Sequence, residues 1–419
     1  MHKKQLLFIS FHTFRTDMHK LPSILLIFFT LSTMINADSI NQLIQESLEK
    51  HPSLRAIQYR LSAMDKRIEN SQNWSNPELI LNVNDIRFDN PTNRALEPMQ
   101  YQAINYKQRF PWFGKLDAKE RYTYALKDVI SDDYEISKVK LAQQIKLTAY
   151  TIIEIKERIS IVKNYEKLTQ QNIALYDAYT ATDTMNHSNS MAAELLLSRL
   201  HIRMERYRAV LSGQKAKLSY LVQKKNISIA QHLSVHKPKS LSYYLSNLFN
   251  NPSYKKTLSQ KEVASRNSEV KALDVNPDPF VQIGYFNRQE YEDYASISVG
   301  FAMPIFGTEK NEAEAARRDT LAAQSASLDY KFALESEIRT NYAKLKEYYN
   351  IYNIIQKDSM PKLKHMFALN EASIKSGEDL FTYTNLLEQK LDLDEERTVA
   401  KAAYLRLQAQ LDALIGKIK

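Results

Sequence analysis

Few side chains in this sequence are spaced for chemistry. Two pairs of adjacent carboxylates, Asp132-Asp133 and Glu395-Glu396, could supply a general acid and a general base. Neighbours in a helix point in different directions, however, so we predict solvated helix surface at both pairs. The 419 residues contain no glycine-rich phosphate loop, no His-Glu-x-x-His pair and no nucleophile elbow. The sequence therefore predicts no enzyme, no catalytic residue and no cofactor.

A second cluster has the ligand chemistry of a soft metal ion. Met185, His187 and Met191 lie close together and could briefly hold an ion such as Cu(I). A polar turn often carries such residues without binding anything, and this is the interpretation that we favour. The chain has no Cys, which removes thiol catalysis, cysteine-metal sites and lipidation of cysteine.

Charge and the N-terminal segment narrow the function classes. The formal net charge is +9, but basic and acidic residues alternate along stretches such as Lys331 to Lys346, so no basic block grips nucleic acid. Residues 1–37 have the pattern of a signal peptide, with a short basic start, the apolar run Leu21 to Leu31 and small residues near Ala37. Met18 begins a better-formed signal than Met1 and is an alternative start.

An internal repeat with a period near 200 residues organises the rest. Asn76-Pro77 recurs as Asn276-Pro277, and Pro111-Trp-Phe-Gly114 recurs as Pro304-Ile-Phe-Gly307. We expect a first repeat over 38–224, a linker over 225–239 and a second repeat over 240–419.

Each repeat places two strands between these landmarks, over 78–88 and 101–110 and then over 280–288 and 294–303. Tilted strands of about 9 to 11 residues cross a bilayer. In the last stretch Ile297, Val299 and Phe301 alternate with small or polar residues, as in a barrel wall between lipid and water. Aromatic residues at the strand ends are candidates for the membrane interface. They are Trp74, Trp112, Phe88, Tyr101, Tyr291, Tyr294 and Phe306.

Long helices follow each strand pair. Residues 115–180 and 308–375 contain no helix breaker except Pro361, and each would be about 100 Å long. Half-length helices are expected over 39–74, 191–224, 240–274 and 379–417. Their lengths suggest that 191–224 stacks on 240–274 and that 379–417 stacks on 39–74. The long helices reverse at two tips, over Asp183 to Ser190 and over Ser376 to Asp379.

This order of elements resembles the TolC-type outer-membrane efflux protein family. The stretches that carry the resemblance are Asn76-Pro-Glu-Leu79, Phe110-Pro-Trp-Phe-Gly-Lys115, Pro304-Ile-Phe-Gly307, Met360-Pro-Lys-Leu363, Ser376-Gly-Glu-Asp-Leu380 and Leu386-Leu-Glu-Gln389. The resemblance implies a mainly α fold with membrane β structure. In it a homotrimer shares one twelve-stranded outer-membrane β-barrel, continued by a long α-helical barrel in the periplasm.

Partners and contact residues also follow from the resemblance. It implies a periplasmic adaptor (membrane fusion) protein and an inner-membrane pump, with the RND type favoured, besides outer-membrane lipid. The adaptor would meet the tips, at Asp183, Ser188, Asn189, Ser376, Gly377, Glu378, Asp379 and Leu380. Carboxylates at the narrow end of such a tunnel could close it, so Asp183, Glu378 and Asp379 are gate candidates, with ordinary helix capping as the alternative for Asp379. The first tip lacks the glycine that the family usually carries.

Two function classes remain open at this stage. The first is a passive exit channel for drugs and other small molecules, with heavy-metal cations as the second cargo because the Asn76-Pro-Glu-Leu79 stretch looks like metal-efflux relatives. The second is a structural or adhesive coiled-coil protein of the envelope, in which the strand-like stretches are loops.

Overall fold

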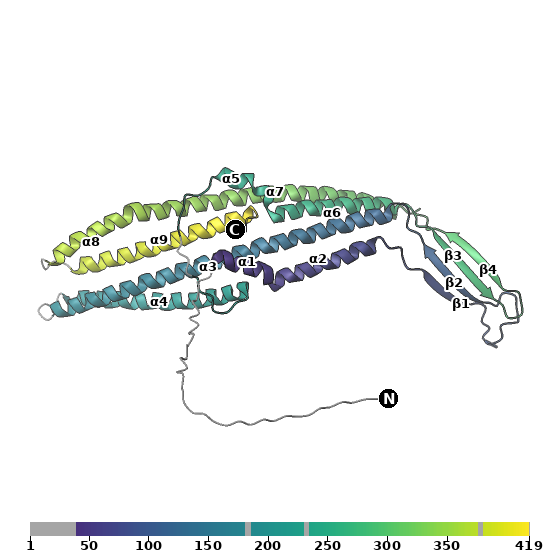
Figure 1. The fold of residues 1–419 in the computed structure, drawn as a ribbon, viewed down its shortest axis with the longest axis horizontal. Helices are drawn as coiled ribbons and strands as arrows, with labels where there is room; N and C mark the ends of the chain where they lie inside the picture. Colours follow the sequence, from purple (N-terminus) through teal and green to yellow (C-terminus); the bar gives the residue numbers. More distant parts are fainter. Residues whose placement is uncertain (1–38, 181–185, 230–233, 376–379, 419) are drawn as a thin grey trace, which may run out of the picture. The chain divides into compact units, whose positions relative to one another are not determined.

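Helices account for most of the residues that the structure describes. The computed structural model describes residues 39–180, 186–229, 234–375 and 380–418, which all belong to one unit, Ala37–Lys419. This unit repeats one plan twice, with half-length helices, a strand pair, a long helix and a return helix in each repeat (Figure 1). The signal peptide predicted over 1–37 lies outside the described residues.

The first repeat contains α1 (Ile40–Lys50), α2 (Pro52–Ser71), β1 (Glu78–Val83), β2 (Gln102–Arg109), α3 (Lys115–Thr180) and α4 (Asn186–Val222). The second repeat contains α5 (Leu241–Ser246), a 3-10 turn (Leu248–Asn250), α6 (Pro252–Asp274), β3 (Phe280–Asn287), β4 (Tyr294–Gly300), α7 (Thr308–Ile354), a π-helical turn (Ile355–Ser359), α8 (Met360–Lys375) and α9 (Leu380–Leu414).

The half-length helices before the strands are each divided at a proline, where single helices over 39–74 and 240–274 were expected. Pro52 opens α2 and Pro252 opens α6, and the preceding side chain caps each helix. His51 accepts a hydrogen bond from the Ser53 amide, and Asn251 accepts one from the Tyr254 amide at 2.8 Å. Proline fits the first helical position because its missing N–H has no partner there, but it ends the helix before it.

The two long helical segments differ in regularity. α3 runs for 66 residues without a break, or about 100 Å at ~1.5 Å per residue. The second segment contains a π-helical turn over Ile355–Ser359, directly before Pro361. Because Pro361 has no N–H and its ring crowds the carbonyl four residues earlier, the helix widens there instead of continuing as a regular α-helix.

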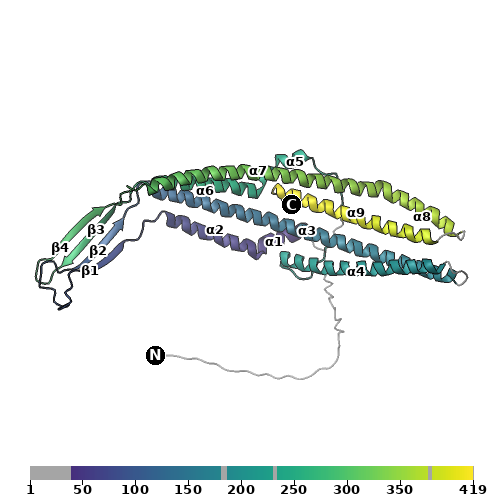
Figure 2. The same cartoon turned by 180° about the vertical axis from the view of Figure 1, so that it is seen from behind.

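The expected end-to-end stacking is wrong in its pairing. The end of α4 packs against α1, where Leu218 and Val222 share a core cluster with Ile40 and Leu43. The end of α9 lies beside the start of α6, where the Asn251 side chain donates to the Leu414 carbonyl at 2.9 Å. Figures 1 and 2 show α4 in line with α1 and α2, and α9 in line with α6. The lengths of the half-length helices could not identify the correct pairs, because these helices are so similar in length that several pairings match one long helix.

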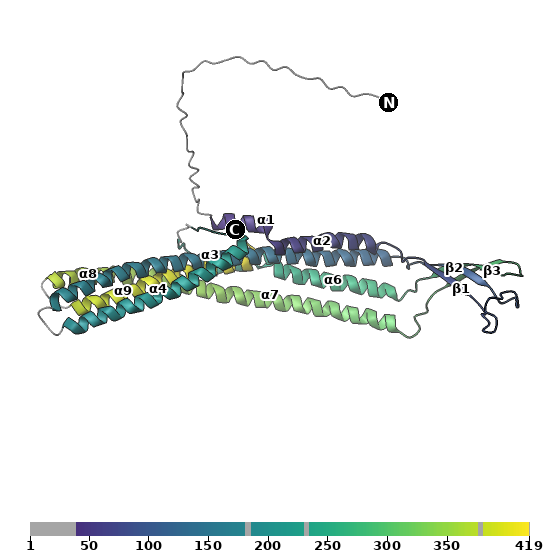
Figure 3. The same ribbon diagram turned by 90° about the horizontal axis from the view of Figure 1, so that it is seen from below.

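Three apolar clusters hold the helices together. One joins α1, α3 and α4 around Ile145 and Leu218, a second joins α5, α7 and α9 around Tyr244 and Tyr404, and a third joins α3, α4 and α9 around Leu200. Seen from below, α2 follows α3 and α6 follows α7 toward the sheet (Figure 3). The sheet therefore continues from helices that already pack side by side.

The sheet has the order β1-β2-β3-β4, and every neighbouring pair is antiparallel. All four strands are shorter than predicted, β2 and β3 by only one or two residues and β1 and β4 by more. β1 ends at Val83 instead of 88, because Asp85 adopts a left-handed conformation (φ 56°) that a strand cannot contain. β4 ends at Gly300 instead of 303, just before the turn that leads to α7.

Candidate functional site

One face of the sheet is apolar and exposed. The register pairs Leu81 with Ile104, Ile104 with Tyr285, and Ile283 with Ile297, so alternate residues of the four strands share this face. Leu81 is 71% exposed and Ile297 is 73% exposed. An exposed apolar face that extends over four strands marks a surface for lipid or for another protein.

The opposite face is polar. Gln282 donates to Asn105 Oδ1 at 3.2 Å, and Lys107 Nζ lies 3.4 Å from Glu78 Oε2 and 4.7 Å above the Phe280 ring. Polar side chains are thus segregated from the apolar face by the two-residue period of the strands. This segregation is what a wall between lipid and water requires.

Two glycines let aromatic rings lie flat on the polar face. A Cβ at Gly284 would come within 2.7 Å of the Phe286 ring, and a Cβ at Gly300 would come within 2.6 Å of the Phe280 ring. Any larger residue would push these rings away from the sheet. The glycines therefore set the position of the rings along the strands.

The sheet is open at both sides. In the part of the chain that the structure describes, no strand pairs with the outer edge of β1 or of β4. Unpaired edges invite pairing with another chain, and within lipid they leave backbone polar groups unsatisfied.

The repeated Pro-x-Phe-Gly motif lies in the segments that connect the sheet to the long helices. Gly114 and Gly307 have φ values of 78° and 75°, which only glycine adopts without strain, and each lies directly before a long helix. Asp278 accepts the Trp112 amide at 2.8 Å and lies 2.8 Å from Lys115 Nζ. These contacts tie the start of α3 to the segment that enters β3.

The seven predicted interface aromatics lie near the ends of the strands but not on one face. Trp74 packs edge-on against Phe110 at 5.2 Å, and Tyr294 stacks on Phe286 at 4.6 Å. Phe286 pairs with Ala103 on the polar face, so Tyr294 and Tyr101, whose ring is 5.0 Å from Phe286, lie there too. The others are exposed to differing degrees, namely Trp74, Trp112, Phe88, Tyr291 and Phe306. Their role at a membrane interface stays a prediction.

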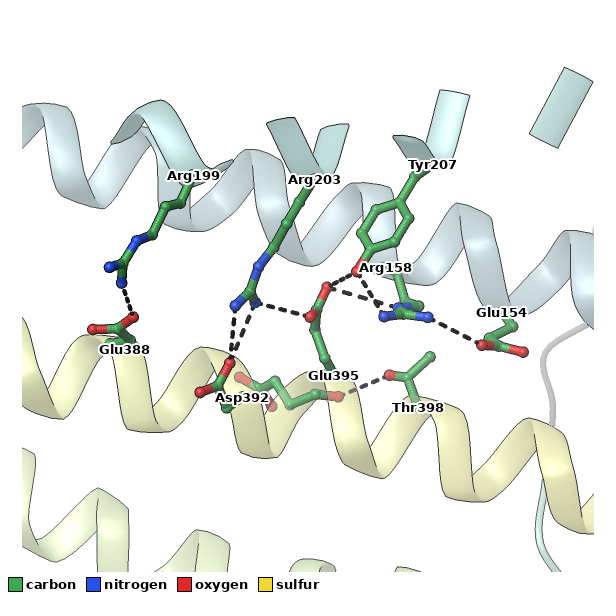
Figure 4. Close-up of polar contacts among 10 residues, drawn as sticks. Glu154, Arg158, Arg199, Arg203, Tyr207, Glu388, Asp392, Glu395 and Thr398 are labelled. Atoms are coloured by element: carbon green, nitrogen blue, oxygen red, sulfur yellow. Dashed lines mark hydrogen bonds and ion pairs between the residues drawn. The ribbon is translucent and has the colours of Figure 1, made fainter. Parts of the chain in front are cut away.

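A polar network joins α3 and α4 to α9 (Figure 4). At its centre Glu395 accepts a hydrogen bond from Tyr207 at 2.6 Å and one from Arg203 at 3.0 Å, and Arg158 Nε lies 3.7 Å away. Arg203 also bonds Asp392 at 3.3 Å. The network therefore links the return helices of the two repeats to each other and to α3.

Burial divides this network into a protected centre and an exposed end. The side chain of Glu395 is 10% exposed, whereas Glu388, which lies 3.1 Å from Arg199, is 36% exposed. Burial and the hydrogen bond to Glu395 raise the pKa of Tyr207 to about 12. Tyr207 therefore remains a protonated donor throughout the physiological pH range.

The prediction of solvated surface at the carboxylate pairs is wrong for Glu395, which is buried, and for Asp132, which is half-buried, whereas the Asp133 side chain is 41% exposed. Glu395 is buried in the network, Asp132 accepts from Ser259 at 2.6 Å and Asp133 lies 2.7 Å from Lys256, whereas Glu396 is exposed. These acids join neighbouring helices. Burial raises the pKa of Asp132, but none of the pairs has both carboxylates directed at one point, as acid and base catalysis would need.

Sequence reasoning missed Arg158, Arg203 and Tyr207. A signal was present, because Arg199 and Arg203 are four residues apart and Glu388, Asp392 and Glu395 lie on one stripe of a facing helix. Nothing in the sequence shows which two stripes meet, however, and that depends on the packing of helices from different repeats.

The predicted metal cluster is only partly described. Met185 lies outside the described residues, and His187 is the second residue of α4 and has no described side chain, while Met191 on α4 is 67% exposed. Within the described ranges, no group of three His, Cys, Asp or Glu side chains could hold a metal ion.

The tip residues lie at or beyond the ends of the described helices. Asp183, Ser376, Gly377, Glu378 and Asp379 are outside the described ranges. Ser188 and Asn189 belong to the first turn of α4, which begins at Asn186, and Leu380 opens α9. The first tip is therefore shorter than the predicted 183–190, because α4 already begins at Asn186. The adaptor and gate roles of the tip residues stay predictions.

Solved structures share this arrangement. No protein-family model matches the sequence, and no curated protein matches it. A crystal structure of CusC, described in terms of transmembrane channel formation, aligns with a TM-score of 0.75 at 12% identity over 91% of this chain and 93% of CusC. The outer-membrane protein VceC of Vibrio cholerae gives 0.73 at 12% identity over 90% and 96%, and the CmeC outer-membrane channel of Campylobacter jejuni gives 0.73 at 13% over 91% and 86%. The chain has the fold of these outer-membrane channels. This channel fold confirms the family resemblance at the level of structure.

The channel fold accounts for the combination of a four-stranded sheet with very long helices. The alignments with CusC and VceC cover nearly the full length of both chains, so the two repeats, the sheet and the long helices are all included in the structural similarity. None of the described helices combines the length and the hydrophobicity that crossing a membrane requires.

Proposed function

We propose that this protein is a passive exit channel of the outer membrane, which passes substrates from an inner-membrane pump across the periplasm and out of the cell. The observation that carries the proposal is the four-stranded sheet, with an exposed apolar face, a polar face and two unpaired edges. Such a sheet is unstable alone in lipid and becomes stable when copies join edge to edge.

The assembly that we propose is a homotrimer. Three copies of a four-stranded sheet would form a closed barrel of twelve strands, with the edge of β1 pairing with the edge of β4 in the next copy. The helices would continue this barrel as a helical tunnel in the periplasm. The number three comes from the family resemblance, and the need for further copies comes from the open edges.

The chain organisation supports the same scheme. We propose that 1–37 is a signal peptide for export, that 38–224 and 240–419 each contribute one strand pair and one helical half, and that 225–239 links them near the middle of the helices.

The tips would face the inner membrane. We propose that they meet a periplasmic adaptor and, through it, an inner-membrane pump, with the RND type favoured. Asp183, Glu378 and Asp379 would close the tunnel and attract cations. If Glu378→Gln and Asp379→Asn together leave single-channel conductance and cation preference unchanged, the gate assignment is wrong.

The cargo that we favour consists of drugs and other small molecules, with heavy-metal cations second. The rival class, an adhesive coiled-coil protein without a channel, would leave the apolar face of the sheet exposed to water. That exposure would cost free energy on every strand.

Planar bilayers test the proposal directly. The purified protein should insert as a trimer and give discrete conductance steps. Cysteines placed at 289–293 should be labelled from outside intact cells, because that loop would then lie beyond the membrane. An adhesive coiled-coil protein would give neither result.

A matched pair of variants tests which face meets lipid. Ile297→Arg places a charge on the apolar face and should cost about 2–4 kcal/mol of insertion free energy per chain. Ser298→Arg, its neighbour on the polar face, should insert normally and change only ion selectivity. Equal insertion of the two variants would contradict the proposed orientation of the sheet.

A further inference from the structure

A small cleft lies at the end of the sheet away from the helices. Its volume is about 240 Å³, and the β1–β2 loop and the strand ends line it together. The lining residues are Arg94, Gln100, Tyr101, Gln102, Asn287 and Gln289. We call this cleft the rim niche. Its lining combines one cation, one tyrosine and four carboxamides and includes no acidic residue, although the Asn287 side-chain amide donates to the carboxylate of Asp293 at 3.2 Å.

Arg94 is the unusual member of the rim niche. Its guanidinium donates to the carbonyls of Asn84, Asp85 and Tyr101, and the residue is only 9% exposed. Nε has no hydrogen-bond partner, and among the described residues no carboxylate lies within ion-pair distance of Arg94. Burial of a cation without a counter-charge is costly, and the three backbone carbonyls offset only part of that cost, so an anion in the niche would stabilise Arg94 further.

Another arginine of the same loop shows the ordinary arrangement. Arg87 is exposed and pairs with Asp89 at 3.1 Å. The loop therefore supplies a carboxylate to its exposed arginine but not to its buried one. This difference supports a ligand for Arg94 rather than a general excess of charge in the loop.

The carboxamides divide into two groups. Gln100 is 1% exposed and holds the loop together by donating to the Asp85 and Asn93 carbonyls and by accepting the Leu96 amide at 2.9 Å. Gln102 and Asn287 instead face each other across β2 and β3 and are exposed. Carboxamides both donate and accept, which suits the hydroxyl groups of a sugar.

The position of the rim niche favours a lipid as the source of the ligand. Gln102 and Asn287 lie on the same face as Ile104 and Tyr285, because alternate residues of a strand share a face. A molecule bound there could place its headgroup in the niche and its acyl chains along the apolar face. A free sugar phosphate has the same polar chemistry but would leave that apolar face uncovered.

We propose that the rim niche binds the phosphorylated saccharide headgroup of a lipid in the outer leaflet of the membrane. Arg94 attracts the phosphate by its charge, and Gln102, Asn287 and Gln289 bind sugar hydroxyls. This inference rests on the proposed function, because only a sheet that spans the outer membrane brings the niche to that leaflet.

Native mass spectrometry of the purified, detergent-solubilised full chain tests the inference. The probes are a diphosphorylated lipid A, the same lipid after removal of its phosphates, phosphatidylethanolamine and glucosamine 6-phosphate. Diphosphorylated lipid A should bind best. Arg94→Gln should weaken that binding at least about tenfold, because it removes the positive charge that attracts the phosphate. Arg87→Gln, the matched control in the same loop, should bind as the unchanged protein does.

A second variant is needed because Arg94→Gln could weaken binding simply by unfolding the β1–β2 loop. Gln102→Ala combined with Gln289→Ala alters the niche without touching the hydrogen bonds of Arg94 and Gln100, and it should also weaken lipid A binding. The inference is overturned if dephosphorylated lipid or phosphatidylethanolamine binds equally well, if only glucosamine 6-phosphate binds, or if both variants bind normally. Conductance measured on the same preparation separates the two proposals. A conducting trimer that binds no lipid A overturns this inference alone, whereas a protein that neither inserts nor conducts overturns the proposed function.

Discussion

Removal of the Glu395 carboxylate should loosen the contact of α9 with α3 and α4. Glu395→Ala removes the buried counter-charge that Arg158 and Arg203 share, leaving them with Glu154 and Asp392, and it removes the acceptor of Tyr207. Hydrogen bonds to a charged group are each worth about 1.5–3 kcal/mol, but contacts that share one residue are not additive. The two arginines are 24% and 30% exposed, so water relieves part of the loss. We expect a cost of about 2–4 kcal/mol in local opening free energy.

Hydrogen exchange measures this cost where it arises. Amides in α4 and α9 near the network should exchange roughly 30- to 700-fold faster in Glu395→Ala, since each 1.4 kcal/mol is about tenfold. Amides of the sheet should be unchanged, because no network residue contacts it.

Glu388→Ala is the matched control. It removes the same side chain from the same interface, but its partner Arg199 is 54% exposed. An exposed pair contributes at most about 1 kcal/mol, so exchange should rise less than about fivefold. If Glu388→Ala accelerates exchange as much as Glu395→Ala, or if Glu395→Ala stays below fivefold, burial is not what gives this network its strength.

Three further predictions concern the repeats and the sheet. Burial lowers the pKa of His51 from its ordinary value of 6.5, so the folded state binds fewer protons than the unfolded state, and stability at the α1–α2 junction should decrease as the pH falls below 6.5. Amide exchange over 40–55 should therefore become faster as the pH-dependent loss of stability sets in. His51→Asn, which copies Asn251 of the second repeat, should remove this acid-dependent loss of protection. If the loss persists in His51→Asn, another titrating group causes it. Gly284→Ala would bring a Cβ within 2.4 Å of Asn105 Oδ1 and should destabilise the sheet by about 1–3 kcal/mol. The proposed trimer should therefore dissociate at a lower temperature on gels. Gly213→Ala, in α4 with nothing within 4 Å, should instead stabilise the helix by up to about 1 kcal/mol, and a loss there would show that the glycine has a packing role.

Local patterns predicted most of the fold. Alternation over 294–303 predicted β4, whose partner β3 lies beside it in the sequence, and the Pro-x-Phe-Gly motif marked the start of both long helices. These features depend on neighbouring residues, through strand periodicity and the freedom of glycine at positive φ. The C-terminal end of β1 was harder, because it depends on how Arg94 and Gln100 fold the following loop onto Asp85.

Contacts between helices that are distant in the sequence could not be predicted in the same way. The stacking of α4 on α1 and the meeting of Arg203 with Glu395 join residues almost 200 positions apart. Any of several helix faces could satisfy the periodicity of a single helix, and only the combined packing of α3, α4 and α9 selects one. The tip residues lie outside the described ranges, so Asp183 and Glu378 stay predictions from resemblance.

The π-helical turn before Pro361 changes the heptad register of the second long helix. Ile338 and Leu345 are buried seven residues apart, whereas Ile355 and Leu363 are buried eight residues apart across the wide turn. One extra residue rotates the downstream side chains by about 100° relative to an uninterrupted α-helix. Heptad positions in α8 must therefore be counted from Pro361 and not from Thr308. A one-residue deletion within 355–359 that spares Ile355 would give Ile355 and Leu363 the ordinary seven-residue spacing and keep both on one face of a regular α-helix, whereas a deletion elsewhere in α7 would rotate the two sides of the deletion relative to each other.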